Sequence, residues 1–414
     1  MEKKTEGAWI INHTKKLQKV DNTQDFEEIE LAGKCGSFLS NLAASHEISE
    51  INKTKVEAIA KASNIKRIEL ETIKKTLCDA RLIDIGANGS VSVLGITTHS
   101  VLGHTSDIFR SVNPTDFQKA SLDLAENISD LPKEGKLLQE YISDTHKLSS
   151  TDIVDLFKQS ENIGFIDFET LDDKSKMYFN GNLFRRDVMK KTQAVLSTLS
   201  QTESRLIGEV DALLSEKGCL AETDVKRILG DQLLSKLQSI GMYDFNDVSN
   251  SSETKTIITK PSAFSKYGNP FEEDALDLAK AFVSSLFYGM NYSANSRGKI
   301  TMLKALMQRL IRGGEVGPAT AIGEDYRLLE FKRVVAIRPD PDYPSRYYMR
   351  LLKRDIGELA LQVLEFGDAN QHTVMSSGSV TKYKGPEEKR VANRLKENEA
   401  SKKTIAQTLK TIRQ

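Results

Sequence analysis

Cysteine and histidine are scarce in this 414-residue chain, which contains three cysteines and six histidines. Cys35, Cys78 and Cys219 are odd in number and far apart, and two of them lie in apolar helical contexts. We therefore expect buried, reduced thiols in a cytoplasmic protein. No closely spaced cysteines or histidines indicate a zinc site, because the pair His99 and His104 has no third ligand nearby. The sequence predicts no metal and no other cofactor.

Long hydrophobic runs and an excess of one charge are also missing. No stretch approaches the roughly 18 apolar residues of a membrane helix, and the charged N-terminal region has no apolar core of a secretory signal. Lys and Arg together number 58, as do Asp and Glu. This balance argues against a protein that simply coats DNA, although a basic field at one face is enough for DNA binding. We expect no membrane partner.

Recognisable catalytic motifs are absent. The glycine-rich stretches at residues 86–90 and 313–318 lack the lysine and Ser/Thr of a phosphate-binding loop, and neither opens a βαβ unit. No serine or cysteine nucleophile motif has a histidine nearby. Asp325, Glu330 and Lys332 are similar in type to the two acids and lysine of metal-dependent nucleases, but the acids are too close to lie on separate strands. The sequence therefore predicts a non-enzymatic protein.

The segment from Lys53 to Ile96 predicts two short helices followed by a tight hairpin. Apolar residues recur at helical spacing, and in the second helix they are Ile68, Ile73 and Leu77. The apolar pattern then alternates on both sides of Asn88-Gly89. This dipeptide accepts positive φ at both central positions of a tight turn.

Helix, helix and hairpin in this order resemble the winged helix-turn-helix superfamily, and the outline returns three times downstream. The four regions share element order and length only. The resemblance implies a mainly α fold with short antiparallel β-hairpins, arranged as tandem winged-helix-like domains. We predict an N-terminal lead-in (1–24), four winged-helix-like domains (25–110, 111–186, 187–265 and 266–367, the last with an amphipathic helix) and a linker with a basic helical tail (368–414).

Further local predictions follow from the same patterns. Residues 98–116 are expected as a connector and residues 187–216 as one long helix. In the fourth domain a short helix is expected to begin near Pro318. Polar turns at residues 172–175 and 249–254 separate apolar runs that should pair as hairpins.

The resemblance also indicates which side chains would contact DNA. In a winged helix the second helix of the helix-turn-helix enters the major groove, and the wing follows the adjacent backbone. In the first domain that helix carries Lys66, Arg67, Lys74 and Lys75, of which Arg67 lies where side chains reach base edges. Asn88 at the wing tip would add a backbone contact. The alternative is that these are solvated charges beside acidic neighbours.

The fourth domain is richer in cations, and tyrosines are interleaved with them, as on surfaces that track a nucleic-acid backbone. A pair of well-solvated helices would have the same composition. The candidate contacts are Arg309, Arg312, Arg327, Lys332, Arg333, Arg346 and Arg350.

The leading hypothesis is a non-enzymatic protein that binds double-stranded DNA through several modules, whose linkage raises weak individual affinities. A regulator, a replication initiator and a DNA-engaging subunit of a larger machine all fit. The alternative is an interaction scaffold whose winged helices dock an ATPase or nuclease partner, with the basic tail as a further site for a protein partner. A metal-dependent nuclease is the third hypothesis.

Overall fold

The computed structural model describes residues 1–20, 24–43, 50–96, 98–249, 253–267 and 273–369. The chain divides into two compact units between Asn182 and Leu183. Both units are mainly helical with small antiparallel sheets, as the sequence predicts. Among the described helices, none is long and apolar enough to cross a membrane. The predicted basic tail and almost all of the linker before it lie outside the described residues.

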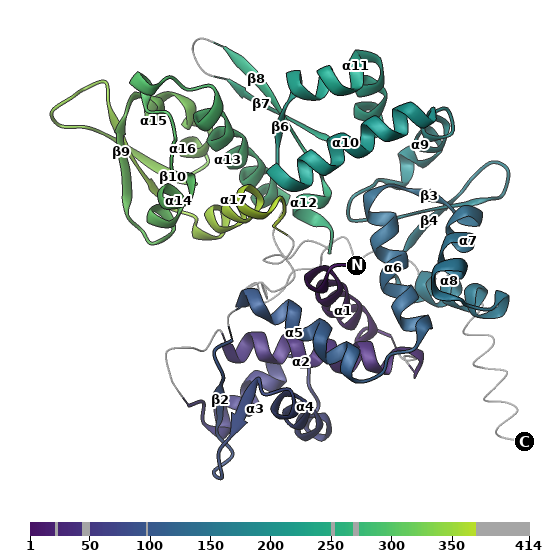
Figure 1. Cartoon of the computed structure of the whole chain (residues 1–414). Helices are drawn as coiled ribbons and strands as arrows, with labels where there is room; N and C mark the ends of the chain where they lie inside the picture. Colours follow the sequence, from purple (N-terminus) through teal and green to yellow (C-terminus); the bar gives the residue numbers. More distant parts are fainter. Residues whose placement is uncertain (21–23, 44–49, 97, 250–252, 268–272, 370–414) are drawn as a thin grey trace, which may run out of the picture. The chain divides into compact units, whose positions relative to one another are not determined.

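The first unit contains the elements up to β5 (Figure 1). Its helices are α1 (Lys3–Leu17), the 3-10 helix η1 (Gln24–Phe26), α2 (Glu27–Ala43), α3 (Lys53–Ala62), α4 (Arg67–Asp79), α5 (Thr98–Ser111), α6 (Asp116–Asp130), α7 (Gly135–His146) and α8 (Ser150–Ile163). Its strands are β1 (Ile83–Ile85), β2 (Val91–Val93), β3 (Lys133–Glu134), β4 (Asp167–Thr170) and β5 (Lys176–Phe179).

The second unit contains the remaining elements. Its helices are η2 (Arg186–Val188), α9 (Met189–Leu196), α10 (Gln201–Lys217), α11 (Glu222–Ser239), α12 (Ser262–Ser265), α13 (Glu273–Asn291), η3 (Asn295–Arg297), α14 (Leu303–Ile311), α15 (Thr320–Asp325), α16 (Arg327–Phe331) and α17 (Arg354–Phe366). Its strands are β6 (Leu220–Ala221), β7 (Asp244–Ser249), β8 (Thr254–Thr259), β9 (Glu315–Ala319), β10 (Val335–Pro339) and β11 (Tyr347–Leu351).

Four segments of the chain share one order of elements: helix, strand, helix, helix, strand, strand. We number them first to fourth, and they cover residues 27–93, 116–179, 201–259 and 303–351. In each segment the strand between the first two helices pairs with the last strand. The three-stranded sheets accordingly have the orders β3-β5-β4, β6-β8-β7 and β10-β11-β9. In the first segment a single bridge between Ile51 and Val91 takes the place of the extra strand.

The third segment follows this order because one glycine divides α11 into two helices. Gly230 has φ 75° and ψ 161°, a conformation that side chains with a Cβ rarely adopt. The two parts of α11 on either side of Gly230 are the second and third helices of this segment. The hairpins predicted around residues 172–175 and 249–254 are also present, as β4–β5 and β7–β8.

The first segment confirms the predicted helices and hairpin but corrects the turn. Only Gly89 of the dipeptide has a positive φ, of 80°. Its N–H donates to the carbonyl of Gly86 at 2.9 Å, and the Gly86 N–H donates to Ser90 at 3.0 Å. These bonds close a three-residue loop in which a turn is followed by one left-handed glycine. Asn88 therefore does not need the positive φ that the sequence predicted for it.

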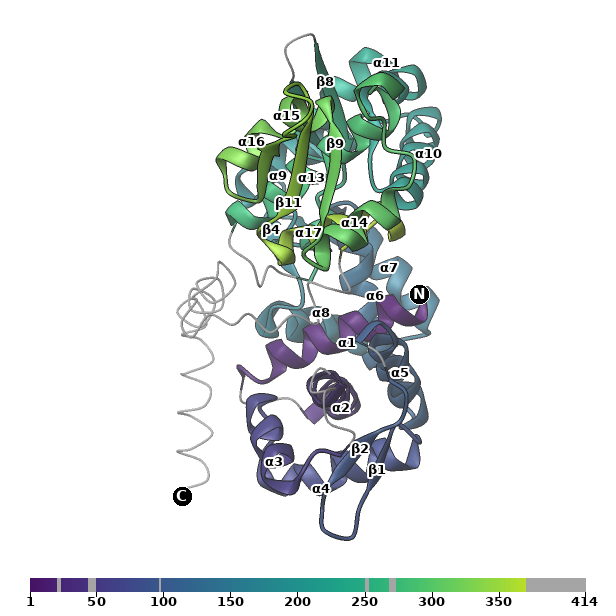
Figure 2. The same ribbon diagram turned by 90° about the vertical axis from the view of Figure 1, so that its left-hand side faces the viewer.

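The predicted lead-in and connector are instead core helices, α1 and α5, which pack side by side with α2 (Figures 1 and 2). Trp9 on α1 and Phe109 on α5 are buried. A Cβ on Gly7 of α1 would overlap the carbonyl of Leu102 on α5, so the two backbones approach as closely as only glycine permits. The helices α1 and α5 therefore form a three-helix core together with α2, the first helix of the first segment.

Residues 187–216 do not form the single helix that the sequence predicted. The helix stops at Leu196 and restarts at Gln201. Ser200 caps the new helix, because its Oγ accepts the Glu203 N–H at 3.2 Å while the Glu203 carboxylate accepts the Ser200 N–H at 2.8 Å. This reciprocal capping box satisfies two backbone donors and starts a separate helix.

In the fourth segment, the short helix expected near Pro318 is present as α15, which begins at Thr320. The sequence did not predict the strand before it, since residues 315–319 form β9, which pairs with β11. The helix that carries Arg309 therefore precedes the first strand and is not one of the close pair α15 and α16. The predicted amphipathic helix is confirmed as α17, whose buried face includes Leu359 and Val363 and packs against α13 and α14.

Candidate nucleic-acid interface

The helix α4 presents exposed cations on its solvent side. Lys66, Arg67 and Lys75 are exposed, and Lys66 precedes the first residue of the helix. The backbone N–H of Lys66 donates to the Glu69 carboxylate at 3.0 Å, which caps the helix start. Arg67 and Lys75 form no ion pair within the described part of the chain. Their charges are therefore available to an anionic partner.

Two other predicted contacts in the first segment already have partners. The ammonium group of Lys74 lies 2.7 Å from the Glu71 carboxylate, and the Lys74 side chain is only 12% exposed. Asn88 Oδ1 accepts hydrogen bonds from the N–H and the hydroxyl of Ser90 at 3.0 and 2.6 Å. The loop that Asn88 stabilises extends past α4 (Figure 2). Lys74 and Asn88 are thus less available for phosphate contact than Arg67 and Lys75.

Beside these cations lies an exposed apolar residue that the sequence placed in the core. Ile68 is 86% exposed, whereas the buried face of α4 consists of Leu70, Ile73 and Leu77. These three share one helical face, which Ile68 does not. An exposed isoleucine next to Arg67 adds an apolar contact to the same surface.

In the fourth segment, α16 and the hairpin that follows it carry most of the predicted cations. Arg327 begins α16, and Lys332 and Arg333 follow its last residue directly. Arg346 lies in the loop between β10 and β11, and Arg350 lies on β11. All five are exposed. The guanidinium of Arg346 lies 5.0 Å from the centre of the Tyr343 ring, so a cation and an aromatic ring occur together at the hairpin tip.

The solvent face of the fourth sheet holds a cation that was not among the predicted contacts. Arg338 lies 4.3 Å from the Tyr348 ring and donates to the Glu315 carboxylate at 2.7 Å. This hydrogen bond, with the charges of Arg338 and Arg350, lowers the pKa of Glu315. Strand register alone would have grouped these residues, since Arg338 is opposite Tyr348 and Arg350 is opposite Glu315. The face combines aromatic and cationic groups with one carboxylate.

Arg309 and Arg312 lie apart from the α15–α16 pair, on α14 and at its C-cap. Both are exposed. Arg309 also lines a pocket between α14, β9 and α15. The predicted contacts of the fourth segment therefore fall into two groups, one on α14 and one on α16 with its hairpin.

The residues similar to a nuclease site are not arranged to hold a metal. Asp325 is buried and lies 2.9 Å from the Arg297 guanidinium, whereas Glu330 and Lys332 are exposed. Within the described residues, no three His, Cys, Asp or Glu side chains are grouped so that they could hold a metal ion. Burial raises the pKa of the Cys35 and Cys219 thiols to about 12, so these thiols stay protonated near neutral pH.

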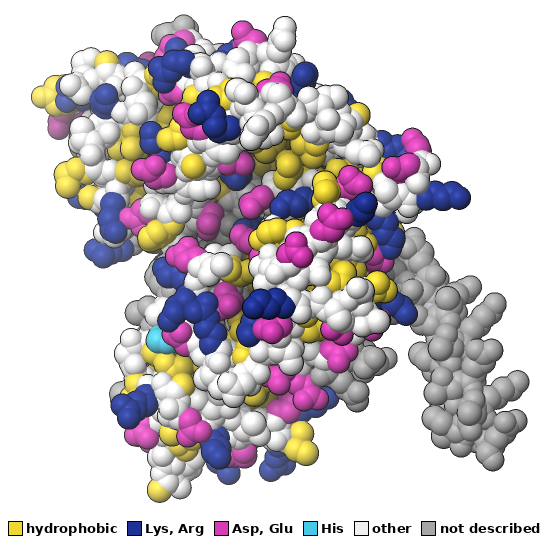
Figure 3. All heavy atoms as spheres, turned by 45° about the vertical axis from the view of Figure 1, so that its right-hand side comes forward, with side chains coloured by type: hydrophobic (Ala, Val, Ile, Leu, Met, Phe, Trp, Pro, Cys, Tyr) yellow, Lys and Arg dark blue, Asp and Glu magenta, His cyan; other side chains and the backbone are white. Residues whose placement is uncertain are grey.

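Charge is mixed on the one face of the molecule that is displayed in Figure 3. On the face that Figure 3 displays, Lys and Arg side chains alternate with Asp and Glu over the described residues. Local cation groups such as those on α4 and α16 therefore matter more than the overall field.

Comparisons of the sequence with known protein families and with curated proteins find no match. The function of this chain is therefore argued from the fold and the side chains themselves.

Proposed function

We propose that this chain is a non-enzymatic DNA-binding protein that engages a duplex through tandem winged-helix-like modules. The observation that carries the proposal is the element order shared by the four segments, in which the first strand joins the last. That order is typical of a winged helix, whose second paired helix reads the major groove. In this reading α4, α8, the second half of α11 and α16 are the recognition helices.

The chemistry of α4 supports this role. Arg67 is exposed at the first residue of the helix, where a guanidinium can reach the major-groove edge of guanine with two hydrogen bonds. Lys75 lies about two turns further on and would contact a phosphate. Lys66 at the N-cap would add a second phosphate contact.

The chemistry of the fourth segment supports a backbone contact. Arg327, Lys332 and Arg333 are grouped around a helix of only five residues. The hairpin adds Arg346 and Arg350, placing cations on both parts of a winged helix that meet DNA. Several weak modules on one chain would combine into useful affinity, so a neutral net charge is compatible with binding.

The test is a fluorescence-anisotropy titration of the full chain against a labelled duplex of about 40 base pairs at several salt concentrations. We expect a negative log–log dependence of the association constant on salt, with a slope near −0.9 for each phosphate contacted. The double variant Lys66→Gln/Lys75→Gln, which removes the two proposed phosphate contacts of α4, should reduce the magnitude of the slope by about two. Lys19→Gln, which removes an exposed lysine outside the four segments, is the matched control. No binding at low salt would reject the proposal.

A protein-interaction scaffold is the second candidate, because apolar side chains are exposed on helices of the same type. Ile68 at the start of α4, Leu137 on α7 and Val154 on α8 are all exposed. Exposed apolar groups on such helices favour contact with a protein. A scaffold would show no salt-dependent retention on heparin or DNA resin. A DNA-binding protein would be retained on the resin and would elute only when the salt concentration is raised.

A further inference from the structure

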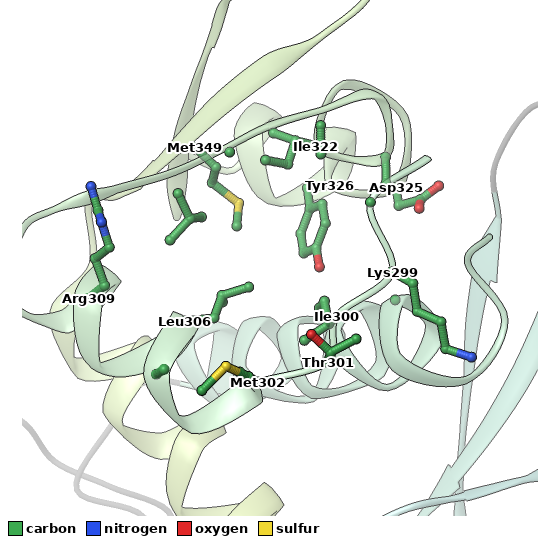
Figure 4. Close-up of a pocket in the computed structure, with 17 residues that line it drawn as sticks. Lys299, Ile300, Thr301, Met302, Leu306, Arg309, Ile322, Asp325, Tyr326 and Met349 are labelled. Atoms are coloured by element: carbon green, nitrogen blue, oxygen red, sulfur yellow. The ribbon is translucent and has the colours of Figure 1, made fainter. Parts of the chain in front are cut away.

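A pocket of about 370 Å³ lies in the second unit, between α14, β9, α15 and the residues just before α14 (Figure 4). Its size is at the lower end of the roughly 300–1,000 Å³ range of small-molecule sites. All its lining residues belong to one compact unit, since they fall between residues 289 and 349. The pocket is therefore a property of this unit alone.

The body of the pocket is apolar. Leu306 of α14, Ile322 of α15 and Met349 of β11 line it from three elements. Met302 at its edge is 70% exposed and extends the apolar surface outward. Such a surface favours an apolar ligand group of about 10–15 non-hydrogen atoms.

One polar group inside the pocket can donate a hydrogen bond to a ligand. Tyr326 is only 4% exposed, and its hydroxyl points into the pocket (Figure 4). Within the described part of the chain this hydroxyl makes no hydrogen bond, and the Tyr326 ring contacts Phe282 edge to face. Burial and the nearby Asp325 charge raise the pKa of Tyr326, so the phenol remains a neutral donor. A buried donor of this kind selects a ligand that accepts a hydrogen bond.

The charged residues that line the pocket carry a net positive charge. Arg309 and Lys299 stand at its opposite ends (Figure 4) and take part in no ion pair among the described residues. The acidic residue of the lining, Asp325, is paired with Arg297 at 2.9 Å. A ligand with a negative charge would therefore gain an ionic contact at the mouth that a cation would not.

We propose that this pocket binds a small amphiphilic carboxylate, with its apolar body between α14 and α15, beside the Tyr326 hydroxyl, and its carboxylate held by a cation at one end of the pocket. The proposal does not depend on DNA binding, because a small carboxylate would occupy the pocket whether or not the chain binds a duplex. It adds a ligand site to a chain for which only macromolecular partners were expected.

The test uses the full chain and two isosteric probes, 1-naphthaleneacetate and the uncharged 1-naphthaleneacetamide, whose binding is followed by saturation-transfer NMR and calorimetry. We expect saturable binding of the acid, with an affinity about tenfold higher than that of the amide. This ratio is what one additional ionic contact would contribute. Equal binding of acid and amide, or no saturable binding of the acid at millimolar concentration, would overturn the proposal.

Three variants locate the site. Ala305→Trp places an indole into the pocket from an exposed position of α14 and should abolish binding without unfolding the helix. Tyr326→Phe removes only the hydroxyl and should weaken binding about threefold to tenfold. Arg309→Gln/Lys299→Gln should weaken it about tenfold.

Arg205→Gln/Lys217→Gln removes the same charge from exposed positions of α10, outside the pocket, and should leave the affinity unchanged. Circular dichroism and melting curves verify that each variant is folded. Acid binding that persists in folded Ala305→Trp would place the ligand elsewhere and reject this site.

Discussion

The carboxylate of Asp325 lies 2.9 Å from the guanidinium of Arg297 and ties the 3-10 helix η3 to the end of α15. The Asp325 side chain is 1% exposed and that of Arg297 is 27% exposed. Glu324 also contacts the same guanidinium, at 2.7 Å. A carboxylate this deeply buried depends on its cation, because an uncompensated buried charge keeps its full cost of desolvation.

The variant Arg297→Met should therefore lower the free energy of unfolding of the second unit by about 2–4 kcal/mol. Hydrogen exchange followed by mass spectrometry on peptides of α13 and α17 is the suitable measurement, because the single tryptophan, Trp9, lies in the first unit. Arg185→Met is the matched control, since Arg185 pairs with Asp187 on the surface and should change stability by less than about 1 kcal/mol. Equal effects of the two variants would contradict the buried pair.

Two adjacent lysines of α4 should differ in their contribution to DNA binding. Lys75 is exposed and unpaired among the described residues, whereas Lys74 is bonded to Glu71 and largely covered. Lys75→Gln should reduce the log–log salt slope by about one, and Lys74→Gln by much less. Anisotropy titrations of the two single variants with one duplex, at matched salt concentrations, measure this difference. Equal slopes would show that the Glu71 contact does not restrain Lys74.

The sequence predicted the elements whose apolar residues face a core on one side and solvent on the other. The hairpin of the first segment follows from simple alternation of apolar and polar residues. The break before Ser200 had a readable signal, a serine followed three residues later by Glu203. It was missed because apolar residues at helical spacing continue across it.

Other elements could not be read from apolar periodicity. The helix α5 buries polar residues, since Thr105 donates to the Val101 carbonyl at 2.9 Å and Ser106 donates to Glu6. Buried hydroxyls with partners are stable in a core but look like loop residues in a sequence. Strands of two residues, such as β3 and β6, have no period at all and depend on the strand they join.

In the candidate site, too, some features can be read from the sequence and others cannot. Cations are visible in a sequence, and so is a partner three residues away, such as Glu71 for Lys74. The contact of Arg297 with Asp325 joins residues far apart in the chain. The pocket likewise draws its walls from α14, β9 and α15, and no short motif marks it.

Close approach of α1 and α5 makes Gly7 sensitive to substitution. A Cβ on Gly7 would overlap the backbone carbonyl of Leu102, which cannot move without shifting α5. Gly7→Ala should therefore lower the free energy of unfolding of the first unit by about 1–3 kcal/mol, as expected for overpacking. Urea unfolding followed by the fluorescence of Trp9 reports on this unit.

Gly103 on α5 is the matched control, because a Cβ there meets no atom within 4 Å. Gly103→Ala should raise stability by about 0.5–1 kcal/mol through helix propensity. If both alanine variants stabilise the first unit, the α1 and α5 backbones do not approach each other closely at Gly7.

Burial of His13 should make the first unit less stable in mild acid. The imidazole is fully buried, its ring stacks on Phe165 at 3.7 Å between centres, and the ammonium of Lys16 is nearby. Burial, with the charge of Lys16, lowers the pKa of His13 well below 6.5. Below about pH 6.5 the unfolded chain therefore takes up a proton that the folded chain does not.

Stability of the first unit should thus fall as pH falls below about 6.5, at up to about 1.4 kcal/mol per pH unit, until the lowered pKa of the folded state is reached. Urea unfolding at closely spaced pH values between 5.5 and 7.5, followed by Trp9 fluorescence, measures the slope. His13→Phe retains a flat ring against Phe165 and cannot titrate, so its slope should be smaller by that amount. His104→Gln, which removes a histidine of α5 outside this stack, should retain the slope of the unmodified chain. A slope that His13→Phe leaves unchanged would assign the acid sensitivity to other groups.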